Sequence, residues 1–542
     1  MKKRPGISRR IFLKTGVKSA TGFFVAGACG GRVFAQEGRL SEIGGTAQTR
    51  YGSVRGRLKN GVYQFFGIPY GASTGGKNRF MPPREHAIWR GVRDCFQYGN
   101  RALMQPGRGE PASVVRALNP QGEQSEDCLN LNVYTGGLDS RARPVMVWLH
   151  GGGFSAGSAN YLLYEGTNLA KKEDVVVVGV NHRLNVHGFL SLADMGGEKW
   201  AQSTNLGMQD QVAALRWVRD NIENFGGDPG RVTIFGQSGG GDKTTTLMAM
   251  PSAQGLFHRA IAQSGTRLRG ILASDANLAA ERFLRKLEIN KNQLDRLQRM
   301  PVQSIQDAYY SEPGIQDLGS GPVIDGIIIP RHPWDPTAPS HSANVPLMMG
   351  STETENGWIG PPPYDLSDDD LLDRLMSRLT GGDVDSGRML LELYKRRHPN
   401  KRNQMLWLTA ESDNTRRWNA QTLGRLKYEQ GTAPSFLYFF DWHSPVHNNR
   451  MGAYHTLDIP FVLYNLDVGA SMTGAAQSRY QLGHVMSAAW AAFARTGNPN
   501  HSDMPTWPAF DPDDYPTMIF GEEVSVMEDP NREERLALMD LK

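Results

Sequence analysis

The segment that most constrains this chain is a short apolar run at residues 232–235, followed directly by G-Q-S-G-G at residues 236–240. A run of β-branched and aromatic residues of this length indicates a buried strand. The G-x-S-x-G pattern indicates a sharp turn from strand to helix that raises the hydroxyl of Ser238 above the sheet. Glycines beside the serine are needed because a Cβ at those positions would clash. The segment therefore predicts a strand–turn–helix unit with Ser238 at its turn.

Two interpretations of this turn are open from the pentapeptide itself. The N-terminus of the following helix directs free N–H groups and a partial positive charge at Ser238, which suits a nucleophile. The same geometry can instead cradle a phosphate. We favour the nucleophile, because the turn follows a predicted strand and candidate partners of a serine occur downstream.

The composition is that of an ordinary globular protein: 542 residues, 39% of them hydrophobic, enough for a sizeable core. The formal net charge of +4 is misleading, because residues 1–35 hold eight Lys/Arg and no acid, which leaves −4 for the remainder. A mildly acidic chain gives no reason to expect nucleic-acid or anionic-membrane partners. The oligomeric state is not indicated.

Residues 1–35 have the pattern of an export signal. S-R-R-I-F-L-K at residues 8–14 resembles the twin-arginine (Tat) signal of bacteria, and V-F-A at 33–35 resembles a cleavage site. The apolar run at 15–28 is too short to span a membrane stably. We expect export to the periplasm or beyond, with residues 36–542 as the mature chain. A cytosolic protein with a basic tail, or a lipoprotein attached through Cys29, are the alternatives.

Beyond the signal, strand and helix patterns alternate. Apolar runs at 145–149 and 175–180 predict strands buried on both faces, and an apolar stripe over 210–225 predicts a helix that stops at G-G-D-P, residues 226–229. Short strands at 51–56 and 63–66 predict an antiparallel edge. This alternation predicts an α/β fold with a mostly parallel, doubly wound sheet in a single domain. Amphipathic patterns at 371–376 and 389–394 predict cap helices, and residues 360–364 a mobile loop.

Many ordered motifs resemble those of the type-B carboxylesterases, the cholinesterase-like branch of the α/β-hydrolase superfamily. They run through most of the mature chain and include F-G-I-P-Y at 66–70, E-D-C-L at 126–129, H-G-G-G-F at 150–154, N-L-G-M-Q-D-Q at 205–211, V-T-I-F-G at 232–236 and F-A-R-T-G-N-P-N at 493–500. The resemblance implies an α/β-hydrolase fold with helical cap insertions. It also implies a Ser–Glu–His triad in that chain order.

The resemblance places the triad on Ser238, Glu355 and His455. Glu355 follows the apolar run at 345–349 and has the family's spacing from Gly350, whereas the competing Glu353 does not. His455 lies in the family's histidine loop, G-A-Y-H at 452–455. Three other histidines are expected to be surface or structural residues: His443, His447 and His484.

The implied reaction is hydrolysis of a carboxylic ester of a small molecule through an acyl-enzyme. Backbone N–H groups of Gly152, Gly153 and Gly239 match the family's three-donor oxyanion hole; a tight turn is the alternative role of the glycine triplet. The mechanism requires no metal and no organic cofactor. Amide or lactone hydrolysis is an alternative, because the attack is the same, and a non-catalytic recognition protein is a more distant one.

The sequence departs from the family at several positions. Gln237 and Gly239 stand where the family usually has glutamate and alanine, and Lys243 replaces a small residue and either lines the pocket or satisfies a polar contact. Cys128 keeps its place, but its usual partner position reads Ala102, with Cys95 seven residues earlier. Whether Cys95 and Cys128 form a disulfide is open, because their separation in space is unknown.

Overall fold

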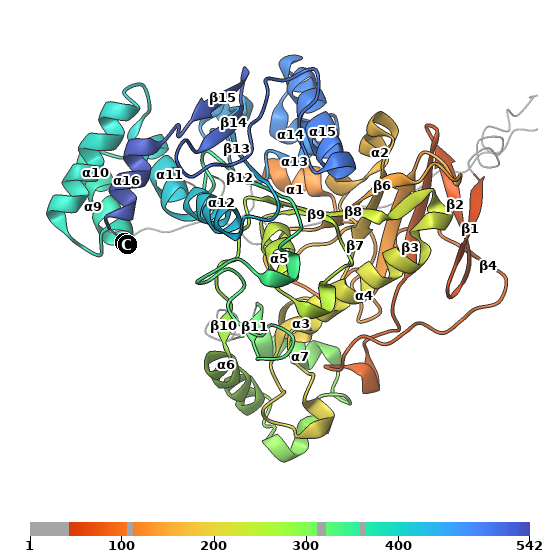
Figure 1. The fold of residues 1–542 in the computed structure, drawn as a ribbon. Coiled ribbons are helices and arrows are strands. Elements are labelled where there is room, and N and C mark those ends of the chain that lie inside the picture. The colour runs from red at the N-terminus through yellow and green to blue at the C-terminus, as the bar shows by residue number, and fades with distance from the viewer. Residues whose placement is uncertain (1–42, 106–111, 312–320, 358–364, 542) are drawn as a thin grey trace, which may run out of the picture. The chain divides into compact units, whose positions relative to one another are not determined.

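The computed structural model describes residues 43–105, 112–311, 321–357 and 365–541. The expected signal, residues 1–35, and the expected loop at 360–364 lie outside these described residues. The described helices and strands are arranged around one large sheet, with a separate two-stranded sheet beside it (Figure 1).

The large sheet contains thirteen strands in the part of the chain that the structure describes. Its strands are β1 (Ile43–Thr49), β2 (Gly52–Lys59), β3 (Val62–Pro69), β4 (Val92–Asp94), β5 (Asn130–Thr135), β6 (Arg143–Leu149), β7 (Val176–Val180), β8 (Gly227–Gln237), β9 (Arg259–Gln263), β12 (Leu347–Thr352), β13 (Ser435–Phe440), β14 (Pro516–Phe520) and β15 (Val524–Glu528). The two-stranded sheet pairs β10 (Ile271–Leu272) with β11 (Val323–Ile324).

The strand order is β1-β2-β3-β5-β7-β6-β8-β9-β12-β13-β14-β15, with β4 beside β2. All neighbours from β7 to β14 in this order are parallel. The path β1-β2-β3-β5-β7 and the last pair, β14–β15, are antiparallel. The predicted mostly parallel sheet with an antiparallel N-terminal edge is confirmed.

Both faces of the central strands are covered, which explains the unbroken apolar runs. In β6, Val145, Val147 and Leu149 join a hydrophobic cluster with α4 (Leu206–Asn221) and α5 (Gly239–Met248). Met146 and Trp148 point to the opposite face and join a second cluster with α15 (Ser478–Thr496). A strand buried on both faces has no solvent side for polar residues.

The other described α-helices alternate with these strands along the chain or follow the last of them. They are α1 (Ala112–Leu118), α2 (Thr167–Glu173), α3 (Asn185–Phe189), α6 (Ala273–Lys286), α7 (Val302–Tyr310), α9 (Asp368–Leu379), α10 (Val384–Arg397), α11 (Asn403–Ser412), α12 (Trp418–Gln430), α13 (Ile459–Val462), α14 (Ala470–Thr473) and α16 (Arg532–Met539). The predicted amphipathic helices are α9 and α10. They pack with α11 and α16 around a hydrophobic cluster of their own (Figure 1).

The predicted stop of the helix over 210–225 is also observed. Helix α4 ends at Asn221, and the 3-10 turn η5 (Ile222–Phe225) is capped by Gly226 at φ 74°. Strand β8 starts at Gly227, earlier than the apolar run indicates, and its pairing with β6 shifts register before Val232.

Cys95 and Cys128 are both buried free thiols, so the disulfide left open by the sequence is not formed. Burial raises the pKa of the Cys95 thiol to about 12 and also raises that of Cys128. Among the helices that the structure describes, none is both long enough and apolar enough to cross a bilayer.

Candidate active site

The site is built where the direction of the sheet's connections reverses. Strand β6 lies between β7 and β8, and the residues that follow β6 and β8 meet at the carboxyl ends of two adjacent parallel strands. The glycine loop 150–153 follows β6, and Ser238 follows β8. In open α/β sheets this switch point is where ligands bind.

Ser238 occupies a strained turn between β8 and α5. Its φ of 58° and ψ of −125° are unfavourable for a residue with a Cβ. The turn is held on both sides: the Ser238 N–H donates to Gln263 O at 2.8 Å, and the Asp242 N–H donates to Ser238 O at 3.0 Å. Ser238 remains partly exposed and lines a pocket.

Glu355 and His455 come from two turns that an isolated bridge holds side by side. Thr354 and Tyr454 form a parallel bridge, which brings the next residue of each turn together. His455 Nδ1 hydrogen-bonds Glu355 Oε2. The other carboxylate oxygen of Glu355 accepts the Thr352 N–H at 2.9 Å, so the carboxylate is fixed at the end of β12.

Electrostatics keep this buried carboxyl ionised. Burial by itself raises the pKa of Glu355, but the charge and the hydrogen bond of His455 outweigh it, so its pKa is below the ordinary value. An ionised Glu355 accepts a hydrogen bond from the Nδ1–H of His455, which orients the imidazole ring.

A pocket of about 340 Å³ unites the residues named from the sequence. Ser238, Glu355, His455, Gly152 and Gly153 all line it. The remaining lining residues are Val114, Leu118, Gly151, Ser155, Ala156, Gly157, Tyr161, Tyr164, Gln237, Asn356, Arg416 and Thr456. Its helical lining comes from α1, from the 3-10 turn η3 (Leu162–Tyr164) and from the π-helical turn η9 (Asp413–Arg417), and not from the described residues of α9 or α10.

Gly239 lies against the glycine loop. A Cβ at Gly239 would come within 2.3 Å of Gly153 O, so the start of α5 approaches the loop as closely as glycine allows. Gly152 and Gly153 have φ of 90° and 59°, which favours glycine. Of the three predicted oxyanion glycines, Gly152 and Gly153 line the pocket, and Gly239 packs directly against Gly153.

Glu353, the competing candidate, forms a different pair outside the pocket. His443 Nε2 lies 2.5 Å from Glu353 Oε2, and Lys401 Nζ lies 2.7 Å from Glu353 Oε1. His443 is therefore a structural partner. His447 lies near Ser113, and His484 near Asp503, and none of the three lines the pocket.

Two of the departures from the family pattern, Gln237 and Lys243, are buried side chains. Gln237 Nε2 lies 3.3 Å from each ring nitrogen of His455. Lys243 is fully buried and donates hydrogen bonds to the two backbone carbonyls at the ends of the glycine loop. Lys243 therefore does not line the pocket but satisfies polar contacts, the second of the two roles expected for it.

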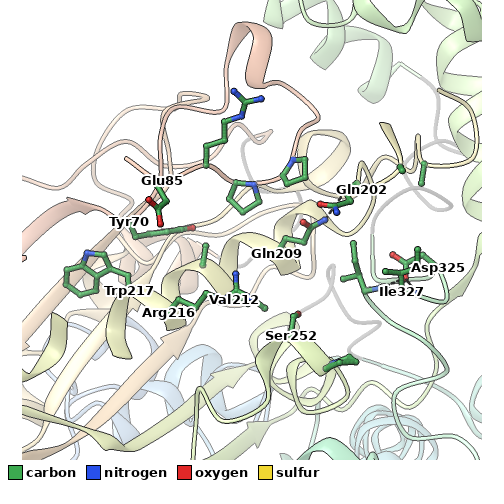
Figure 2. A pocket seen from close by; sticks show the side chains of 18 of the residues that line it. Tyr70, Glu85, Gln202, Gln209, Val212, Arg216, Trp217, Ser252, Asp325 and Ile327 are labelled. Carbon is green, nitrogen blue, oxygen red and sulfur yellow. Dashed lines mark hydrogen bonds between the residues drawn. The ribbon is translucent and has the colours of Figure 1, made fainter. Parts of the chain in front are cut away.

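A larger cavity of about 710 Å³ lies elsewhere, along α4 (Figure 2). Its labelled lining includes Tyr70, Arg216, Trp217 and Asp325 and none of the predicted site residues. Size alone does not locate the chemistry in this chain. In the described parts of the chain, no group of three or more His, Cys, Asp or Glu residues is arranged to hold a metal ion.

Comparison with known proteins shows which family the chain belongs to. The model of the carboxylesterase family matches residues 44–539. The chain belongs to the carboxylesterase family. It is 35% identical to the para-nitrobenzyl esterase of Bacillus subtilis over 503 residues, covering 91% of this chain and 98% of that one. It is 33% identical to the phenmedipham hydrolase of Pseudarthrobacter oxydans, covering 88% and 95%.

Solved structures of carboxylesterases also superpose on the chain. A carboxylesterase of Geobacillus stearothermophilus gives a TM-score of 0.78 at 35% identity, with 91% of this chain and 99% of that chain covered. An esterase of Clostridium hathewayi that can hydrolyse aliphatic aromatic polyesters gives a TM-score of 0.79 at 33% identity, with 92% of this chain and 98% of that chain covered. The predicted α/β-hydrolase fold is confirmed, and the chain is an enzyme that hydrolyses carboxylic esters.

The sequence did not reveal two features of the site. Arg416 reaches the pocket from a π-helical turn in a region where only amphipathic patterns were visible. The environment of Lys243 was also undetermined, because its partners are backbone carbonyls, which carry no sequence signal.

Proposed function

We propose that this carboxylesterase works as a serine hydrolase, with Ser238 as nucleophile, His455 as general base and Glu355 as the group that orients the imidazole. The observation that carries the proposal is the His455–Glu355 hydrogen bond in the same pocket as the strained Ser238. Nucleophile, base and orienting acid within one small pocket are the requirements of this mechanism.

Acylation begins when the Ser238 Oγ attacks the carbonyl carbon of the ester. His455 Nε2 takes the hydroxyl proton, and ionised Glu355 stabilises the imidazolium that results. The carbonyl π electrons move to oxygen and give a tetrahedral oxyanion. When this intermediate collapses, the bond to the alcohol oxygen breaks and His455 donates its proton to the departing alcohol.

The oxyanion is stabilised by the N–H groups of Gly152, Gly153 and Gly239. These donors come from a loop whose positive φ angles only glycine adopts easily, and from the first residue of α5, where intrahelical acceptors are lacking. Loss of one such donor typically costs about 3–4 kcal/mol of transition-state stabilisation. Water then repeats the sequence on the acyl-enzyme, with His455 as base, and releases the carboxylic acid.

The test compares wild type with Ser238→Ala on a chromogenic ester such as p-nitrophenyl butyrate. The variant is expected to lose at least about 10⁴-fold in kcat/KM, because the nucleophile is gone while the fold persists. Circular dichroism and thermal unfolding check the fold. A variant with more than a few per cent of wild-type activity would contradict the assignment of Ser238.

Two further measurements address the alternatives. A fluorophosphonate probe should add one adduct on Ser238, and its absence together with no turnover would favour a non-catalytic recognition protein. A matched p-nitroanilide should turn over at least about 100-fold more slowly than the ester if ester cleavage is the favoured reaction. Faster cleavage of the anilide, or of a lactone, would overturn the ester preference.

We also propose that the chain is exported through its twin-arginine signal, with residues 1–35 removed. The support is sequence alone: the paired arginines, the weak apolar run and the V-F-A site. N-terminal sequencing of protein recovered outside the cytoplasm should begin at Gln36. An N-terminus still at Met1 in that fraction would refute cleavage.

A further inference from the structure

Lys243 is an unusual residue for its position. It lies in the first turns of α5, just behind the serine turn, and its side chain is 0% exposed. No ion pair to a carboxylate is found for it in the described part of the chain. Its Nζ instead donates to two backbone carbonyls, His150 O at 2.9 Å and Gly153 O at 2.7 Å.

These two carbonyls are the ends of the loop that carries the oxyanion donors. The N–H groups of Gly152 and Gly153 belong to the two peptide units between them. The peptide before this pair carries the carbonyl of His150, and the peptide after it carries that of Gly153. The single ammonium group therefore holds the loop immediately before and immediately after the donor peptides.

The two inner peptides are fixed by other groups. The His150 ring holds Gly151 O through Nδ1 at 2.8 Å, and the Ala156 N–H holds Gly152 O at 3.0 Å. All four successive carbonyls of the loop thus accept a hydrogen bond, and the lysine supplies the outer two. Because the glycines have no side chains, these backbone contacts fix the direction of the N–H groups.

A charged ammonium group at this buried place is removed from water, which is unfavourable. Burial lowers the pKa of Lys243 to about 7, and Asp242 only partly compensates. The titratable and charged groups around it are Asp242 with its partner Arg416, the stacked rings of His150 and His182, and Arg267, which shares the Phe154 ring with it. An apolar side chain would avoid this unfavourable burial, and rules broken in this way concentrate at functional sites.

We propose that Lys243 is a positioning residue for ester hydrolysis, whose ammonium group clamps both ends of the glycine loop and so preorganises the oxyanion donors. The proposal rests on the proposed function, because the loop matters to catalysis only if it receives the oxyanion. Preorganised donors stabilise the transition state more than the bound ester, so the clamp acts on kcat and little on KM.

The chain offers a matched control in Lys427. Its Nζ is also buried and donates to two backbone carbonyls, Ser342 O at 3.0 Å and Ala343 O at 2.7 Å, and burial lowers its pKa to about 8. Lys427 lies on α12 and does not line the pocket. It therefore shares with Lys243 the burial and the two carbonyl partners, and adds a hydrogen bond to Gln430 Oε1 at 2.8 Å, but it does not contact the glycine loop.

The experiment compares Lys243→Met with Lys427→Met in kcat, KM, melting temperature and affinity for a phenylboronic acid, which forms a tetrahedral adduct with an active-site serine. We expect kcat of Lys243→Met to fall about 10- to 100-fold, somewhat less than the loss of a whole donor. KM should stay within about threefold, and boronate affinity should fall with kcat. Lys427→Met should keep kcat, KM and boronate affinity within about twofold of wild type.

Equal kcat values in the two variants, or a Lys243→Met loss confined to melting temperature, would overturn the proposal. If Lys243→Met does not fold, wild-type kcat decides: the neutral amine makes weaker bonds, so kcat should decline between about pH 7 and pH 9. A kcat that stays flat over that range would also overturn it. Absence of turnover in wild type would instead refute the proposed function, which keeps the two failures distinct.

Discussion

Two glutamates that follow β12 and lie two residues apart each pair with a histidine. The two pairs have the same residue types but differ in exposure, in neighbours and in position relative to the pocket. Glu355 pairs with His455, whose side chain is 6% exposed, in the pocket beside Ser238. Glu353 pairs with His443, whose side chain is 43% exposed, and also with Lys401. A carboxylate that holds an imidazole is therefore no sign of catalysis by itself.

The difference arises from what lies around each pair. Glu353 has a second cation, so its charge is matched within a small ionic cluster, and that cluster lowers its pKa to about 2 in spite of burial. Glu355 is also influenced by Arg416, but its carboxylate accepts hydrogen bonds from the imidazole of His455 and from the Thr352 N–H. The first pair joins elements of the fold, whereas the second lines the same pocket as Ser238.

Removing each histidine in turn should give the largest difference in kcat between the two pairs. His455→Ala is expected to lower kcat by at least about 10⁴-fold, because it deletes the only base proposed for Ser238. His443→Ala should change kcat by no more than about twofold. Both are measured on p-nitrophenyl butyrate at saturation. Comparable losses in the two variants would mean that the pairs have been assigned wrongly.

Neutralising each carboxylate is the next largest contrast. Glu355→Gln is expected to lower kcat about 10⁴-fold, because an amide cannot stabilise the imidazolium and favours the wrong tautomer. Glu353→Gln should leave kcat within about threefold while it lowers the melting temperature. If Glu353→Gln is the variant that loses kcat, Glu353 takes the place proposed for Glu355.

The sequence predicted the backbone framework well because burial on both faces leaves a direct signal. The unbroken apolar run at 145–149 became β6, and the stripe over 210–225 became α4 with its turn. The family's spacing also distinguished Glu355 from Glu353, and the structure places only Glu355 in the pocket. Roles in catalysis stay predictions until the variants are measured.

What the sequence could not supply are contacts made by backbone atoms or across long separations. Lys243 binds carbonyls about 90 residues earlier in the chain, and a carbonyl has the same chemistry in every residue. The sequence left open whether Cys95 and Cys128 form a disulfide, because it does not report their separation in space; both are buried free thiols. The amphipathic patterns of α9 and α10 predicted helices but not the surface that they cover.

The smallest expected effect concerns stability in acid, and it isolates the pair at Glu353. The folded-state pKa of about 2 lies below the ordinary value of 4.5, so this group stabilises the fold above about pH 4.5 and loses that contribution as pH falls toward 2. The difference corresponds to at most about 3 kcal/mol at its maximum. His443 has a raised pKa, mainly through its hydrogen bond to Glu353, so its own contribution is complete below about pH 6.5 and is lost as pH rises through the raised value.

Both partners are therefore charged near pH 5 to 6, where urea unfolding of Glu353→Gln should show its largest deficit against wild type. The deficit should shrink as pH falls from about 4.5 toward 2, because the glutamate is protonated first in the unfolded chain and in the folded protein only near pH 2. Lys401→Met leaves His443 in place, so its deficit against wild type should be only part of that of Glu353→Gln. A deficit that is constant with pH would show that Glu353 stabilises the fold by packing and not by charge. It would contradict the claim that Glu353 belongs to a stabilising ionic cluster.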